Sequence, residues 1–144
     1  MVNFLELFGI YKDTPENFAR IFKKCREDLL IATDLDSELF GNHLVLGTIM
    51  ELARNGITIK LIYSSEANLK KVPRIKRIID EGYISARSYD GSSDYFIVGD
   101  GWRYRAHGYI NDKSFEMARK FRAQFDQIWN LATHKSNLYQ ESNA

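Results

Sequence analysis

The sequence has few cysteines to cross-link the chain, few prolines to kink it and no long apolar run. It has one cysteine, Cys25, which excludes an intramolecular disulfide and a zinc site built from cysteines. It has only 2 prolines, and 44% of its residues are hydrophobic, which argues against a disordered or low-complexity protein. No apolar run approaches the roughly 18 residues that a membrane-spanning helix needs. These absences predict a folded, soluble domain.

The first residues also lack a recognisable secretory signal. Residues Met1–Phe4 have neither the basic start nor the long apolar stretch of a secretory signal peptide, so we expect a cytoplasmic protein. A chain of 144 residues has the length of a single domain. We assign residues 1–133 to this domain and expect the polar residues 134–144 to form a flexible C-terminal tail.

Neither sign of charge is in excess. Lys and Arg total 20 and Asp and Glu total 19, so the net charge is +1. This balance argues against binding nucleic acid through overall charge, although a local patch can still bind phosphate. One dense basic cluster lies on the outer face of a predicted helix, where it either faces solvent or contacts phosphate. It comprises Lys70, Lys71, Arg74, Lys76 and Arg77.

Hydrophobic periodicity predicts four helices and five strands in alternation. The helices are expected to start at Thr14-Pro15, Asn42, Pro73 and Ser114, and the strands to occupy 29–33, 57–63, 84–89, 94–99 and 102–109. Residues 1–11 fit a short helix or a strand equally. Strand–helix–strand units favour a parallel core, and Asp100-Gly101 predicts a hairpin that adds an antiparallel pair. The expected fold is a single α/β domain with a mixed β-sheet flanked by helices.

The element order and three segments resemble one half of the phospholipase D superfamily. Members of that family carry H-x-K-x(4)-D on a strand, then a hairpin, a Gly/Ser element with an Asn, and a helix that ends in F-x-x-x-W. The corresponding segments are 93–101, 107–111 and 125–129. The residues that match are Asp100, Gly101, Asn111, Phe125 and Trp129. In element order the resemblance covers most of residues 14–131.

The residues that carry the family's chemistry are replaced here. Ser93 stands at the position of the nucleophilic histidine, and Tyr95 at that of the phosphate-binding lysine. A serine without a neighbouring base is a poor nucleophile, and a tyrosine supplies no fixed positive charge to a phosphate. The resemblance therefore implies a catalytically inactive phospholipase D-like module that binds a ligand or a partner, with no cofactor and no metal.

One histidine offers an alternative site. A phosphodiesterase or nuclease with a site rearranged around His107 would need a second titratable group within reach of the imidazole. His43 and His134 are interpreted as structural or solvent-exposed. The candidate ligand-binding site comprises Ser93, Tyr95, His107 and Asn111.

The remaining polar and aromatic clusters have structural interpretations. The acidic segment 34–38 is interpreted as helix capping rather than a metal site. Arg103 and Arg105 alternate along a predicted strand, and we expect them to pair with Asp94 across the hairpin. Five aromatic residues are expected in the core, namely Trp102, Tyr104, Phe121, Phe125 and Trp129.

The resemblance also implies a homodimer, because single-half members of the family pair two chains about a two-fold axis. An exposed face with Tyr95, Trp102 or Tyr104 would supply the interface, whereas burial of these aromatics would favour a monomer. Three functions therefore remain open: an inactive module for a ligand or protein partner, a nucleic-acid-binding module using residues 70–77, and a rearranged phosphodiesterase.

Overall fold

A seven-stranded mixed sheet forms the centre of the protein. The structure, a computed structural model, describes residues 4–91 and 94–143. The strands are β1 (Ile10–Lys12), β2 (Asp28–Thr33), β3 (Thr58–Tyr63), β4 (Ser85–Ser88), β5 (Phe96–Gly99), β6 (Arg103–Ala106) and β7 (Tyr109–Asn111). Their order is β1-β7-β6-β5-β2-β3-β4. Strands β2, β3 and β4 are parallel, and the other pairings are antiparallel, which confirms the predicted mixed sheet.

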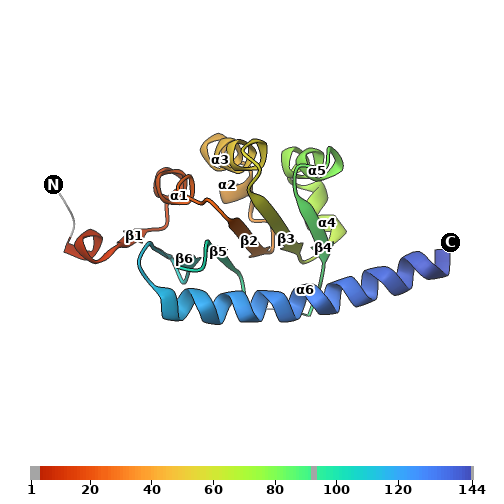
Figure 1. Ribbon diagram of the computed structural model, residues 1–144. Helices are drawn as coiled ribbons and strands as arrows, with labels where there is room; N and C mark the ends of the chain where they lie inside the picture. Colours follow the sequence, from red (N-terminus) through yellow and green to blue (C-terminus); the bar gives the residue numbers. More distant parts are fainter. Residues whose placement is uncertain (1–3, 92–93, 144) are drawn as a thin grey trace.

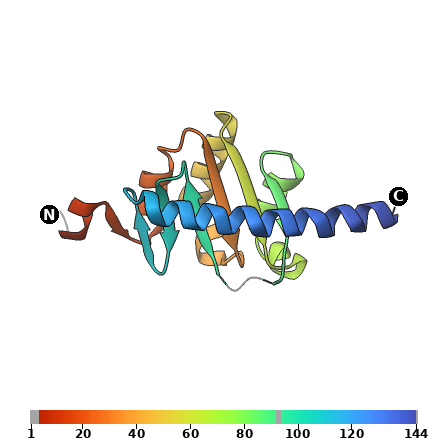
Figure 2. The same cartoon turned by 60° about the horizontal axis from the view of Figure 1, so that its bottom comes forward.

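Helices cover both faces of this sheet (Figure 1). They are η1 (Phe4–Phe8), α1 (Pro15–Phe22), α2 (Ser37–Phe40), α3 (His43–Arg54), α4 (Glu66–Lys70), α5 (Pro73–Asp80) and α6 (Phe115–Asn143). Helices α1, α3 and α5 lie on one face, and the long α6 crosses the other face from β6 to β4 (Figures 1 and 2). None of the described helices is both long and apolar enough to cross a membrane.

Local side chains explain why two of the helices begin where the sequence predicts. The Thr14 hydroxyl accepts a hydrogen bond from the Asn17 N–H at 3.1 Å, and Pro15 occupies the first turn of α1. The Asn42 side chain accepts from the Leu44 N–H at 2.8 Å and caps α3 in the same way. These polar caps satisfy N–H groups that have no partner inside the helix.

The core has two layers, one on each face of the sheet. Along β2, Leu29 and Ile31 pack with α1 and α3, whereas Leu30 and Ala32 pack under α6. This alternation is the period of two that a strand imposes on its side chains. The layer under α6 also contains Phe96, Phe121, Phe125, Ile128 and Trp129. The prediction that Phe121, Phe125 and Trp129 are core residues is confirmed, while Trp102 and Tyr104 are only half-buried.

The predicted strand 102–109 is wrong, because a turn divides it. His107 and Gly108 both have positive φ angles, 55° and 84°, and join β6 to β7 as a two-residue hairpin loop. Ala106 pairs directly with Tyr109 across that loop. Positive φ at both central positions is the geometry that fits the twist of the strands, and glycine accepts it without strain.

The predicted pairing of two arginines with Asp94 is also wrong. Arg105 forms its ion pair with Asp13, 2.7 Å away, and Asp94 accepts a hydrogen bond from Gln124 instead. Arg103 pairs with carboxylates at the opposite end of β6, as described below. The hairpin register places Arg105 opposite Ile97, so its side chain meets the segment before α1 rather than the start of β5.

Several short elements go beyond the prediction. Residues 4–12, which fit either structure, contain both, η1 and β1. Helix α4 starts where the Ser65 hydroxyl accepts from the Asn68 N–H, and the Asp36 carboxylate accepts from the Glu38 N–H at the start of α2. The latter contact supports capping as the role of the acidic segment. Helix α6 extends to Asn143, and the flexibility of residues 134–144 stays a prediction.

Candidate functional site

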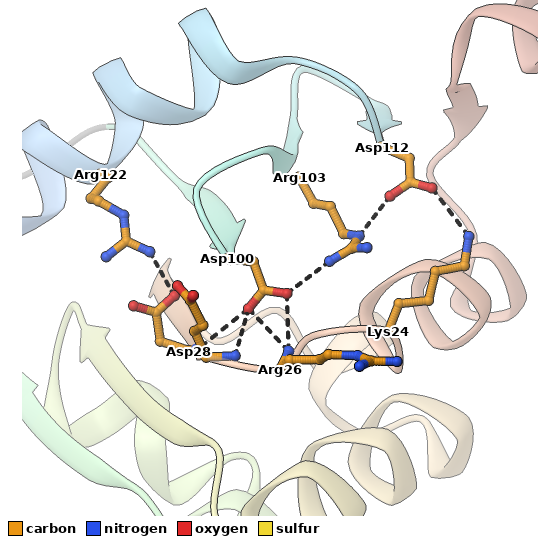
Figure 3. Close-up of polar contacts among 8 residues, drawn as sticks. Lys24, Arg26, Asp28, Asp100, Arg103, Asp112 and Arg122 are labelled. Atoms are coloured by element: carbon orange, nitrogen blue, oxygen red, sulfur yellow. Dashed lines mark hydrogen bonds and ion pairs between the residues drawn. The ribbon is translucent and has the colours of Figure 1, made fainter.

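The Asp100 carboxylate organises the edge of the sheet where the parallel strands begin (Figure 3). It accepts hydrogen bonds from three consecutive backbone N–H groups, those of Arg26, Glu27 and Asp28, at 2.8–3.3 Å. It also binds the Nη1 of Arg103 at 2.9 Å. Consecutive N–H groups that converge in this way form an anion-binding nest, which here holds a carboxylate of the chain itself.

A chain of charges continues from Asp100 to the protein surface. Arg103 is buried, with 8% of its surface exposed, and its Nε donates to Asp112 at 2.6 Å. The second oxygen of Asp112 pairs with the Lys24 ammonium at 3.1 Å, as Figure 3 shows. On the other side of the nest, Arg122 of α6 binds Asp28 at 2.6 Å. These contacts fix the loop between α1 and β2 against β6, β7 and α6.

A hollow of about 580 Å³ opens beside this network. Four of its lining residues are cationic, and none of the residues that line it, all within the described part of the chain, is Asp or Glu. We call it the cationic hollow. It is lined by Lys23, Lys24, Cys25, Arg26, Leu52, Asn55, Ile57 and Arg103. A surface of this charge attracts anions, and Asn55 adds an amide to the rim.

The charges of the cationic hollow are of two kinds. Lys24 and Arg103 are held by Asp112 and Asp100, so their positions are fixed. Lys23 and Arg26 are exposed, and neither forms an ion pair within residues 4–91 and 94–143. Figure 3 shows the Arg26 side chain extending away from the Asp100 carboxylate that holds its backbone. Two exposed cations on a rigid frame therefore border the hollow.

Cys25 lies within this surface but offers no nucleophile. Burial, followed by the charge of Asp100, raises the pKa of the thiol to about 12 from its ordinary value of 9.0. A thiol rather than a thiolate is present near neutral pH, and only the thiolate is reactive. Its neighbour across the sheet is Gly99, where an added Cβ would lie 2.5 Å from the Cys25 sulfur. The close approach requires glycine at that position.

The arrangement of strands and helices is shared with known structures. One is TrmBL2, an archaeal chromatin protein described as showing a novel mode of DNA binding; the TM-score is 0.64 at 14% identity, covering 85% of this chain and 52% of that chain. Another is NucT from Helicobacter pylori, with a TM-score of 0.64 at 14% identity, covering 84% of this chain and 94% of that one. This chain thus spans about half of the chromatin protein.

These likenesses show a common α/β fold, which is consistent with the phospholipase D-like half that the sequence resembles. No family model matches the sequence, and no curated protein matches it. The function must therefore be argued from the residues of this chain, since one fold hosts many activities.

The three described residues of the candidate ligand site do not gather at one place. Ser93 lies outside the described residues. Tyr95, 42% exposed, precedes β5, and His107 follows β6, so the antiparallel register brings both to the same edge of the sheet. Asn111 pairs with Tyr104 at the far end of β7. Ligand binding by these residues stays a prediction.

The expected dimer face is divided in a similar way. Tyr104 packs on Phe121, with ring centroids 5.2 Å apart, and Trp102 contacts Phe115 at 5.9 Å. Tyr95 remains on the surface. The homodimer stays a prediction.

The basic cluster does not lie on one helix, because Lys70 ends α4, Lys71 follows it, and only Arg74, Lys76 and Arg77 belong to α5. Two of the α5 cations are neutralised by acidic residues one turn later. Lys76 pairs with Asp80 at 2.7 Å, and Arg77 pairs with Glu81 at 3.1 Å. Such i,i+4 pairs on an exposed helix face leave less charge for an outside phosphate. Whether the cluster contacts nucleic acid stays a prediction.

A second hollow of about 700 Å³ lies at the opposite edge, where β3 and β4 end. It is lined by Tyr63, Ser64, Ser65, Glu66, Ala86, Arg87, Ser88, Tyr89, Asp90 and Ala132. The Tyr63 hydroxyl donates to Glu66, and burial, followed by this contact, raises the pKa of Tyr63. Arg87 lies over the Trp129 ring, 3.9 Å from its centroid. No group of three metal-ligating side chains occurs among the described residues.

The cationic hollow was not predicted from the sequence. Its cations come from the end of α1, the following loop and β6, which are about 80 positions apart in the chain. The signal that could have indicated it is the run Lys23, Lys24 and Arg26 directly before a buried strand. A cluster of this kind becomes a surface only when the sheet order is known.

Proposed function

We propose that this domain binds nucleic acid through the phosphate backbone at the cationic hollow, without hydrolysing it. The observation that carries the proposal is the hollow's lining, in which four cationic side chains meet. Asp112 and Asp100 pair with two of them, whereas Lys23 and Arg26 form no ion pair among the described residues. Lys and Arg contacts to phosphate release condensed counterions and supply most of the sequence-independent affinity for nucleic acid. Contacts of this kind position a strand without reading its bases.

The cations held by carboxylates and the exposed cations have different roles in this proposal. Lys24 and Arg103 form the fixed part of the lining, because Asp112 and Asp100 hold them in place and offset much of their charge. Lys23 and Arg26 are exposed beside that fixed part and are the side chains that contact phosphate oxygens. Arg26 suits this role because its guanidinium can donate two parallel hydrogen bonds to one phosphate.

Binding without hydrolysis follows from what the chain puts at the family's reactive positions. Ser93 and Tyr95 replace the nucleophile and the phosphate-binding cation. His107 occupies a tight turn and is exposed, so it lacks the enclosed setting in which an imidazole acts as a base. The fold shared with a chromatin protein whose structure is described as showing DNA binding is compatible with this role.

The decisive experiment reverses the two exposed cations. The Lys23→Glu/Arg26→Glu variant is compared with Lys70→Glu/Lys71→Glu, which makes the same change in charge at two exposed lysines on the other basic segment. Fluorescence anisotropy with labelled oligonucleotides gives the dissociation constant over a range of salt concentrations. We expect the first variant to bind at least about 10-fold more weakly and to lose about two units of salt slope.

The matched control decides between the two basic surfaces. The Lys70→Glu/Lys71→Glu variant should stay within about 2-fold of the parent protein, since general charge effects are small at physiological salt. A larger loss in this control would assign the interface to residues 70–77. Absence of salt-dependent binding by the parent protein would refute nucleic-acid binding altogether.

A further inference from the structure

We infer that the cationic hollow takes an unpaired strand of nucleic acid, whose bases stack on Trp102 and Phe115. This inference rests on the proposed function and adds the class of nucleic acid. It comes from an aromatic pair that lies beside Arg103, one of the residues that line the hollow, and that belongs to neither buried cluster. Phe115 is 67% exposed, and its ring centroid lies 5.9 Å from that of the half-buried Trp102.

The aromatic pair is joined to the cations by short contacts. The Arg103 guanidinium, which lines the hollow, lies 5.1 Å from the centre of the Trp102 ring. The Ser114 N–H donates to the Trp102 carbonyl at 3.0 Å, so the start of α6 is tied to the β5–β6 turn. The two rings are therefore held at the edge of the cationic surface rather than on a free segment.

A large exposed aromatic side chain in this place is costly to leave in water. Phe115 contributes to neither of the two buried clusters, so packing of the core does not explain it. Arg119 follows four positions later on the same face of α6 and is also exposed. The Trp102 ring has Arg103 beside it, and Phe115 has Arg119 one helical turn away, which matches a strand whose bases and phosphates alternate.

Duplex nucleic acid would not use this platform, because its bases are already stacked on one another. An unpaired strand can place a base against Phe115 while its phosphates reach Lys23 and Arg26. Proteins that bind single strands without sequence preference combine a positive groove with aromatic stacking platforms in this way. The arrangement predicts a preference for single strands with little dependence on base sequence.

The test compares three probes of one length: a 15-nucleotide single strand of thymidines, a 15-base-pair duplex, and an abasic strand with the same phosphates. We expect the parent protein to bind the thymidine strand about 10-fold more tightly than the abasic strand. Phe115→Ala should remove that difference and leave affinity for the abasic strand unchanged. The matched control is Met117→Ala, on the same helix and 36% exposed, which should change neither affinity.

Tryptophan fluorescence gives a second readout. Trp129 is buried, so quenching by the thymidine strand should come from Trp102 and should be absent with the Trp102→Phe variant. Equal affinity for all three probes, or a Phe115→Ala variant that binds like the parent, would contradict stacking of bases on the aromatic pair. If Lys23→Glu/Arg26→Glu still abolishes binding in that case, the proposed phosphate interface stands and only the stacking inference fails.

Discussion

Asp100 and Arg103 form a buried ion pair across the β5–β6 turn, with an oxygen to nitrogen distance of 2.9 Å. Each partner has further contacts. Asp100 accepts hydrogen bonds from the backbone N–H groups of residues 26–28, and Arg103 forms an ion pair with Asp112. The pair therefore links two segments that are more than 70 positions apart in the chain. Its removal should affect both the fold and the cationic hollow.

We expect Asp100→Ala to lower the free energy of unfolding by about 3–5 kcal/mol, because it leaves three backbone N–H groups without their acceptor and removes one of the two carboxylates that bind Arg103. Urea denaturation followed by circular dichroism measures the change. Asp80→Ala removes the exposed partner of Lys76 and should cost less than about 1 kcal/mol. Similar losses in the two variants would contradict the structural role of Asp100.

Trp129 packs α6 against the sheet. Its ring stacks on Phe125, with centroids 5.8 Å apart, and carries the guanidinium of Arg87 on its surface. Trp129→Ala should therefore cost about 3–5 kcal/mol of stability, through the cavity and the lost contacts. Leu131→Ala, at a position 52% exposed on the same helix, should cost less than about 1 kcal/mol. An unchanged melting temperature for Trp129→Ala would show that the helix is not docked as described.

The Cys25 thiol should resist modification in the folded protein. Burial raises its pKa to about 12, so at pH 8 iodoacetamide should react far more slowly with native protein than with protein unfolded in guanidinium. The unfolded thiol ionises near its ordinary pKa of 9.0 while the folded thiol keeps its proton. The thiol's stabilising contribution is thus fully present below pH 9 and declines between pH 9 and 12.

The corresponding control is Cys25→Ala, which removes the titrating group. The stability difference between the parent and this variant should change in the parent's disfavour by up to about 1.4 kcal/mol per pH unit above pH 9. Rapid alkylation of the native protein at pH 8, or a difference that does not vary with pH, would contradict a buried neutral thiol.

Phosphodiester hydrolysis should be absent. Ser93 and Tyr95 give the site neither the nucleophile nor the fixed cation of the family that the sequence resembles. A chromogenic phosphodiester, together with single- and double-stranded DNA, should show no turnover above background. Turnover that disappears in His107→Ala would instead support a rearranged site around that imidazole.

The fold was predictable where local rules and burial agree. The capping side chains Thr14 and Asn42, and the continuous apolar run of β2, specify their elements with little help from the rest of the chain. The turn at His107-Gly108 was missed because a histidine with positive φ is uncommon outside such hairpins. Its flanking residues also continue the pattern of a strand on both sides.

The candidate site was much less predictable, because its charges come from distant segments. The sequence suggested Asp94 as the partner of Arg105, whereas Asp13 becomes its partner because β1, which Asp13 follows, pairs with β7 beside β6. The basic cluster at residues 70–77 was visible, but Asp80 and Glu81 pair with two of its five cations. Local density of charge is a weak guide when neutralising groups lie one helical turn away.

The position of α6 has a consequence for synthesis of the chain. This helix crosses one face of the sheet from β6 to β4, yet it follows every described strand in the sequence. While a ribosome is still making residues 115–132, the apolar side chains of Phe96 and Val98 have no cover, although the strands can already pair. The nascent domain therefore passes through a stage with an exposed hydrophobic sheet, at which chaperones or a neighbouring nascent chain compete with α6 for the same surface.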